Sequence, residues 1–146
     1  MNILRKKIFE SKGSEYTIEE LGPNKFKHEG KIFEWVDFNF FSCRGKNLCG
    51  SIFKEHNGPC DNLIVMCTGN KGNRSSVNKY LKLLLQENYC VAIFDYNGLG
   101  HSDILPISYG FYESQDLKIF LVEINYRFQY KNLILWGWSM GTQTIL

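Results

Sequence analysis

The sequence predicts an α/β fold in which an N-terminal antiparallel hairpin leads into a mostly parallel sheet with helices on both faces. Three observations support this expectation. Short, continuous apolar runs, typical of strands buried on both faces, recur along the second half of the chain. Segments with helical spacing of apolar residues separate these runs, so that strand and helix alternate. Two β-rich segments joined by a short turn precede the first run.

The chain divides into a lead-in and one domain. Residues 1–30 are mostly polar, contain a Gly-Pro pair and are expected to form an irregular lead-in, and residues 31–146 form the predicted domain. The hairpin is expected at residues 32–40 and 48–54, and the buried strands at residues 63–67, 90–94 and 133–136.

Two amphipathic helices are expected between the buried strands. In residues 75–87 apolar side chains fall on one helical face, with Ser75 or Ser76 as the N-cap and Asn88 as the stop. The apolar face of the second helix comprises Leu117, Phe120, Leu121, Ile124 and Phe128. The last residues of the chain are expected to begin a third helix.

The composition argues against several classes of partner. The chain of 146 residues has 17 basic and 15 acidic side chains, a net charge of +2, which gives no reason to expect a nucleic acid. No stretch approaches the roughly 18 apolar residues of a membrane span, so no integral membrane segment is expected. Five cysteines without metal-binding spacing predict reduced thiols in a cytoplasmic protein: Cys43, Cys49, Cys60, Cys67 and Cys90.

The motif that carries chemistry follows the third apolar run. Residues 137–141 read Gly-Trp-Ser-Met-Gly and lie between a predicted strand and a predicted helix. A nucleophilic serine at such a turn stands clear of the sheet, and the flanking glycines let strand and helix approach closely. Ser139 is therefore the candidate nucleophile, with the amide of Met140 as the first oxyanion donor. The plainer interpretation is a tight turn with an accidental serine.

The loop after the first apolar run, residues 68–74, is expected to supply a second oxyanion amide. Its plainer interpretation is a glycine-rich connection between strand and helix. It does not match the spacing of a phosphate-binding loop, and the glycines of the chain do not match a dinucleotide fingerprint.

Three ordered motifs together resemble the α/β-hydrolase superfamily. They are Thr-Gly-Asn-Lys-Gly at residues 68–72, Phe-Asp-Tyr-Asn-Gly-Leu-Gly-His-Ser at residues 94–102, and the turn at residues 137–141. The chain looks most similar to the serine-aminopeptidase-like branch, which carries H-G-N-x-G in the first motif. The resemblance covers roughly residues 38–146, the N-terminal part of such a protein.

That resemblance implies a function. Ser139 would be the nucleophile, and the backbone amides of Met140 and Asn70 the oxyanion hole. The reaction would be hydrolysis of an ester, thioester or amide bond in a small-molecule or acyl-protein substrate, through an acyl-enzyme and without a cofactor. One departure is Thr68, which stands where the family has a histidine that shapes the loop.

The expected triad is incomplete. In this fold the acid and the histidine follow the serine, yet the seven residues after Ser139 include no Asp, Glu or His. The three histidines, His28, His56 and His101, all precede it. His101 is a candidate base, although a surface-loop histidine is the plainer interpretation. Asp95 is a candidate catalytic carboxylate, although the resemblance favours a role in fixing its loop.

The sequence therefore predicts a truncated domain that is inactive by itself, because the fold needs about 200–250 residues. In such a domain the apolar strand at residues 133–136 is expected at or near an open sheet edge. The alternative is a non-catalytic α/β-hydrolase-like remnant or binding module. The substrate and the oligomeric state are not predicted.

Overall fold

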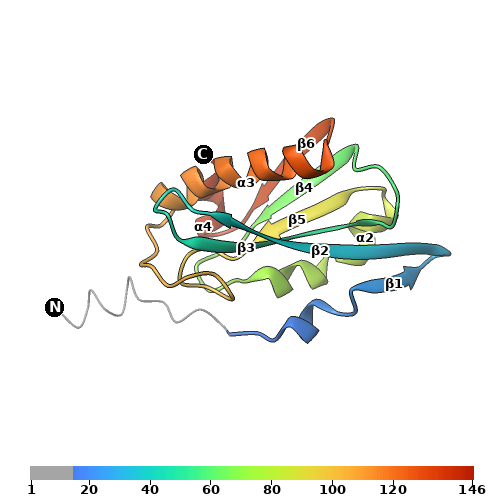
Figure 1. The fold of residues 1–146 in the computed structure, drawn as a ribbon, viewed down its shortest axis with the longest axis horizontal. Helices are drawn as coiled ribbons and strands as arrows, with labels where there is room; N and C mark the ends of the chain where they lie inside the picture. Colours follow the sequence, from blue (N-terminus) through green and yellow to red (C-terminus); the bar gives the residue numbers. More distant parts are fainter. Residues whose placement is uncertain (1–14) are drawn as a thin grey trace.

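The computed structural model describes residues 15–146, which form a six-stranded sheet with helices on both faces (Figure 1). The strands lie in the order β1-β2-β3-β5-β4-β6. Their bounds are β1 Lys25–His28, β2 Lys31–Phe41, β3 Asn47–Glu55, β4 Asn62–Cys67, β5 Cys90–Phe94 and β6 Asn132–Gly137. The helices are η1 Ile18–Leu21, η2 Arg74–Lys79, α2 Leu81–Gln86, α3 Phe111–Phe128 and α4 Met140–Ile145.

The antiparallel half of the sheet is the predicted hairpin, β2 and β3, extended by β1. Strands β2 and β3 pair from Phe33 opposite Glu55 to Phe41 opposite Asn47. The turn between them closes with the Ser42 amide donating to the Lys46 carbonyl at 2.7 Å. Strand β3 then pairs antiparallel with β5, which joins the hairpin to the rest of the sheet.

The lead-in is more regular than expected. Residues 18–21 form the 3₁₀-helix η1, and β1 pairs antiparallel with β2. Strand β1 was not predicted because it has only four residues, of which Phe26 alone is strongly apolar. Its ring stacks on Phe33 of β2, with centroids 5.8 Å apart. Residues 1–14 of the expected lead-in lie outside the described part of the chain.

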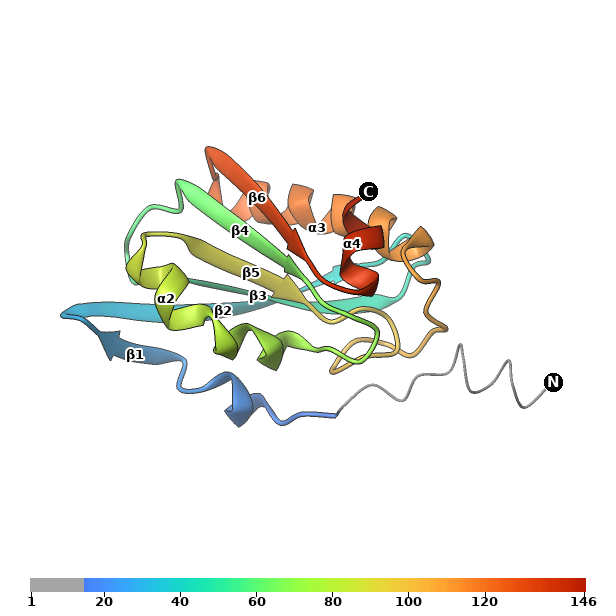
Figure 2. The ribbon, with the colours of Figure 1, turned by 180° about the vertical axis from the view of Figure 1, so that it is seen from behind.

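The parallel half consists of β5, β4 and β6, with β4 paired to both neighbours. Alternate residues of β4 belong to two hydrophobic clusters, Leu63 and Val65 to one and Ile64 and Met66 to the other. Helices α3 and α4 cover the first cluster, and η2 and α2 cover the second. Figures 1 and 2 show α3 and α2 on opposite faces. The expectation of helices on both faces is confirmed.

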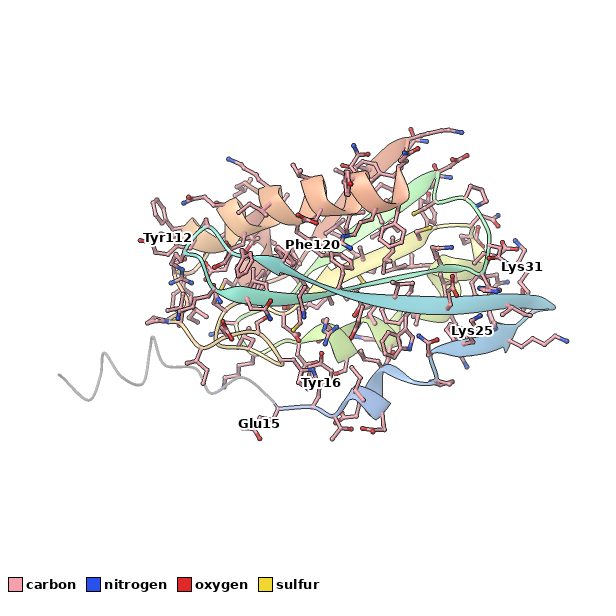
Figure 3. The ribbon with its side chains drawn as sticks, in the orientation of Figure 1. Glu15, Tyr16, Lys25, Lys31, Tyr112 and Phe120 are labelled. Carbon is pink, nitrogen blue, oxygen red and sulfur yellow. The ribbon has the colours of Figure 1, made fainter. Side chains whose placement is uncertain are left out.

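The face under α3 is largely aromatic. Phe120 of α3 is fully buried and lies 4.7 Å from Phe94 and 5.6 Å from Phe38, measured between ring centroids. Figure 3 shows Phe120 on α3 and Tyr16 at the start of the described chain, on the other side of the sheet. Both faces are thus sealed by large side chains.

One local expectation was wrong. The helix expected at residues 75–87 is split at Tyr80 into η2 and α2, and its N-cap is Asn73, whose side chain accepts from the Ser75 amide at 2.9 Å. Spacing at i and i+3 suits a 3₁₀-helix as well as an α-helix, so the periodicity did not separate the two. The C-terminal stop is correct, because Asn88 adopts a left-handed φ of 60°.

The strand expected at or near an open sheet edge is β6, and this expectation is confirmed. It lies at the end of the sheet order and pairs only with β4 in the described chain. Leu133 and Ile134 are consequently 37% and 45% exposed. An apolar run does not reveal whether its strand lies at the centre or at the edge of a sheet.

None of the helices within residues 15–146 has the length and apolar character needed to span a membrane.

Candidate active site

Ser139 occupies a strained turn between β6 and α4. Strand β6 ends at Gly137 and α4 begins at Met140, so the chain reverses within two residues. Ser139 has φ 55° and ψ −127°, a conformation that side-chain-bearing residues rarely adopt. The Thr142 amide and hydroxyl both donate to the Ser139 carbonyl, at 3.0 and 2.7 Å, which holds the turn closed.

The close approach of α4 to the sheet requires a glycine. A Cβ on Gly141 would overlap the backbone carbonyl of Cys67, the last residue of β4. The same carbonyl accepts from the Trp138 amide at 3.2 Å. Strand β4 and the Ser139 turn are therefore packed backbone to backbone, and the loop that follows β4 begins beside the serine.

The loop of residues 68–74, hereafter loop 68–74, passes directly over Ser139. A Cβ on Gly69 would lie 3.2 Å from the Ser139 Cβ and 3.5 Å from its hydroxyl oxygen. The loop then turns, with the Gly72 amide donating to the Gly69 carbonyl at 3.0 Å. Asn70 lies in this turn. The structure thus brings the loop expected to carry Asn70 against Ser139, and Met140 follows Ser139 in the chain.

Thr68, which stands in place of the family histidine, is buried beneath the same loop. A Cβ on Gly72 would lie 2.5 Å from the Thr68 Cβ, so the two small residues pack together. The Thr68 hydroxyl has no hydrogen-bond partner among the described residues. This buried and unpaired hydroxyl is a cost that the sequence did not predict.

Asp95 fixes two loops at the end of β5. Its side chain is fully buried and accepts four hydrogen bonds. The Arg74 backbone amide donates to one oxygen at 2.7 Å, and the Arg74 guanidinium donates to the other at 3.1 Å. The His101 amide and the Tyr16 hydroxyl donate to that second oxygen, at 3.0 and 2.9 Å. This arrangement favours the loop-fixing role of Asp95 over a catalytic one.

His101 is held by Arg74 and does not contact Ser139. An Arg74 guanidinium nitrogen lies 3.1 Å from the His101 Nδ1, and the imidazole packs on Tyr16 with ring centroids 4.5 Å apart. Because arginine only donates, Nδ1 accepts and the neutral ring carries its proton on Nε2. In this tautomer Nε2 is a hydrogen-bond donor and cannot accept a proton as a base.

The other two histidines lie elsewhere. His56 contacts Glu34 at 2.7 Å on the antiparallel half of the sheet, and His28 is the last residue of β1, beside Phe33. In residues 15–146 the Ser139 hydroxyl makes no hydrogen bond to a histidine or a carboxylate. The described residues also contain no group of three side chains suited to a metal ion.

Arg74 and Tyr16 are the residues that sequence reasoning missed. Arg74 precedes an amphipathic helix, a place where arginine is usually solvated, yet only 2% of it is exposed. Its ion pair with Asp95 joins residues 21 positions apart, and its contact with Tyr16 joins residues 58 apart. The only available signal was an arginine at the end of a loop expected to line the site.

The sequence is similar to two uncharacterized bacterial proteins. No protein-family model matches the chain. It is 31% identical over 128 residues to the uncharacterized protein YfhR of Escherichia coli strain K12, a match that covers 86% of this chain and 43% of YfhR. It is 33% identical over 106 residues to the uncharacterized protein YqkD of Bacillus subtilis strain 168, covering 72% of this chain and 34% of YqkD. The chain spans less than half of these relatives.

Three solved structures of hydrolases superpose on the chain. The Pyrococcus furiosus esterase Pf2001 superposes with a TM-score of 0.70 at 23% identity, over 90% of this chain and 48% of the esterase. A cold-adapted esterase from an Arctic intertidal metagenomic library gives 0.62 at 16% identity, over 84% of this chain and 57% of that protein. The α/β hydrolase GrgF of a Penicillium species gives 0.60 at 20% identity, over 70% and 37%. Over most of its length the chain therefore has part of the α/β-hydrolase fold.

Proposed function

We propose that the protein is a serine hydrolase that cleaves an ester, thioester or amide bond through an acyl-enzyme on Ser139. The observation that carries the proposal is the conformation of Ser139. Its φ of 55° on a strand-to-helix turn is strained. Backbone strain of this kind is kept only where the surrounding structure enforces it, and it is concentrated at active sites. The approach of Gly69 to within contact distance of the serine side chain adds to this support.

The proposed mechanism assigns three groups. The Ser139 hydroxyl oxygen forms a bond to the substrate carbonyl carbon and gives up its proton to a base. The amides of Met140 and Asn70 donate to the oxyanion that develops on the carbonyl oxygen. The leaving group takes the proton as its bond to carbon breaks, and water then releases the acyl group by the reverse sequence.

The base and its carboxylate partner are proposed to come from outside residues 15–146. The Ser139 hydroxyl has neither as a hydrogen-bond partner within these residues, and His101 offers the wrong ring nitrogen. The chain by itself is then expected to turn over little or no substrate. A small-molecule or acyl-protein substrate fits this chemistry, and the five free thiols fit the reducing cytoplasm.

A second candidate is a non-catalytic hydrolase-like protein, a remnant or binding module. Thr68 in place of the histidine and the unpaired Ser139 hydroxyl favour it. The two candidates make different predictions about serine reactivity, because an activated serine reacts with fluorophosphonates and an ordinary one does not.

The test starts from the protein immunoprecipitated from its native source, with its intact mass measured. The native protein is then treated with a fluorophosphonate probe, beside a Ser139→Ala variant and a Ser114→Ala control on α3. Labelling that survives in Ser114→Ala and disappears in Ser139→Ala supports the hydrolase. A folded native protein that never labels at Ser139 overturns it in favour of the non-catalytic candidate.

A further inference from the structure

We infer that Arg74, which is ion-paired with Asp95 and covered by Tyr16, positions loop 68–74 so that the Asn70 amide faces Ser139. The inference rests on the proposed function for the role of that amide. It makes Arg74 and Tyr16 positioning residues, which act through the loop and touch no substrate.

The Arg74 side chain is anchored on four separate segments. One terminal nitrogen donates to Asp37 of β2 and to Ser51 of β3, both at 2.7 Å. The other terminal nitrogen donates to His101, and Nε donates to the Tyr16 hydroxyl at 2.7 Å as well as to Asp95. An arginine fork bonded in so many directions leaves the backbone of its own residue little freedom.

The loop is therefore fixed at both ends. At one end Gly69 packs against Ser139, and at the other the Arg74 amide donates to the Asp95 carboxylate at 2.7 Å. Only residues 70–73 lie between these anchors, and the bond from Gly72 to Gly69 constrains them further. The direction of the Asn70 amide depends on both anchors holding.

Tyr16 completes the cluster from the N-terminal side. Its hydroxyl accepts from the Arg74 Nε and donates to Asp95. Burial, followed by the nearby Asp95 charge, raises the pKa of Tyr16 well above its usual range, so the hydroxyl keeps its proton. The ring also lies beside the guanidinium, 5.8 Å from it, and shields the ion pair from water.

The energetics favour positioning over stabilisation. Transferring two charged groups from water into a protein interior is unfavourable. Replacing a buried ion pair by apolar side chains often leaves the stability of a protein unchanged or raises it. A buried pair of this kind is therefore a poor means of stabilising a sheet already filled with aromatic side chains. It is an effective means of fixing one backbone geometry, because each guanidinium nitrogen has a defined partner.

The test compares Tyr16→Phe, which removes only the bridging hydroxyl, with Tyr126→Phe, which alters a tyrosine that is 83% exposed on α3. Amide hydrogen exchange of this chain is followed by NMR at Gly72 and Arg74, whose amides close the loop. We expect about tenfold faster exchange at both amides in Tyr16→Phe, the effect of losing a hydrogen bond to charged groups. Val65 and Ala92 in the central strands should change less than about twofold, and Tyr126→Phe should match the wild type.

Arg74→Lys is the second variant, since it keeps the charge and loses the fork, and we expect a larger effect confined to the same loop. Unchanged exchange at Gly72 and Arg74 in Tyr16→Phe overturns the inference. Exchange that accelerates equally at Val65 and Ala92 also overturns it, because the cluster would then be only a structural support.

Fluorophosphonate labelling of the native protein separates this inference from the proposed function. The native wild type, if it labels at Ser139, should label about tenfold faster than Tyr16→Phe, with both proteins still folded at the assay temperature. An unchanged labelling rate with a loosened loop overturns the positioning role alone. If the native wild type never labels, the proposed function is overturned. The role of loop 68–74 in catalysis is then overturned as well, independently of the exchange rates.

Discussion

Replacing Ser139 by glycine is expected to make the protein more stable than replacing it by alanine. Glycine normally destabilises relative to alanine, by about 0.5–1 kcal/mol, because it loses more backbone freedom on folding. At Ser139 the order should reverse, since the residue has φ 55° and ψ −127° and alanine keeps the Cβ that makes this conformation unfavourable. Both variants lack the hydroxyl, so their difference isolates the backbone.

The magnitude follows from two opposing effects. Holding a side-chain-bearing residue in such a region costs about 1–3 kcal/mol. Subtracting the entropy loss of glycine leaves Ser139→Gly more stable than Ser139→Ala by about 0.5–2 kcal/mol. For a chain of this size that difference corresponds to a melting temperature about 1–6 °C higher.

The assay is urea unfolding of both variants, followed by tryptophan fluorescence and far-UV circular dichroism. Ser114 of α3 supplies the matched pair, where glycine should be less stable than alanine by about 1 kcal/mol because the backbone is helical. If glycine is the less stable residue at both positions, then the Ser139 turn is not strained and the main support for its proposed role is lost.

Three further predictions concern packing and thiol chemistry. Gly141→Ala should lower the free energy of unfolding by about 3 kcal/mol or more in urea titrations, since its Cβ overlaps the Cys67 carbonyl, and wild-type stability would contradict this packing. Phe120→Ala should cost about 3–5 kcal/mol by the same assay, and a loss below about 1 kcal/mol would contradict its central place. Cys43 should react slowly with iodoacetamide at pH 8 despite its exposure, because desolvation and then Asp116 raise its pKa to about 11. The expected rate is about 100-fold below that of an ordinary thiol and rises until about pH 11, whereas a plateau near pH 9 would refute it.

The strands were predicted well because their signal is local. Three continuous apolar runs and one β-rich pair gave five of the strands with bounds within one residue, and the alternation with helices gave the parallel pairing. What failed depends on neighbours that the sequence does not name. Strand β1 is held by its pairing with β2, which its own four residues do not indicate. The split at Tyr80 depends on a helix type that the periodicity does not resolve.

The candidate site divides in the same way. Ser139, Met140 and Asn70 were nominated from short motifs, and the structure brings loop 68–74 against Ser139, while their catalytic roles remain proposals. The Arg74 cluster was not predicted, because its members come from five segments and each one, taken alone, is an ordinary polar residue. Only in the folded protein is Arg74 buried and bonded to each of these neighbours.

The open side of β6 has a practical consequence for the purified protein. Within residues 15–146 no strand pairs with that side, and Leu133 and Ile134 lie partly exposed along the strand. Unpaired backbone donors and acceptors beside apolar side chains form a template on which other chains add as strands. Lys131, the residue before the strand, is ion-paired with Asp61 at 2.9 Å and therefore adds little net charge against such addition. Residues 15–146 by themselves are therefore expected to associate through β6 when concentrated, and dilute, cool preparations suit them best.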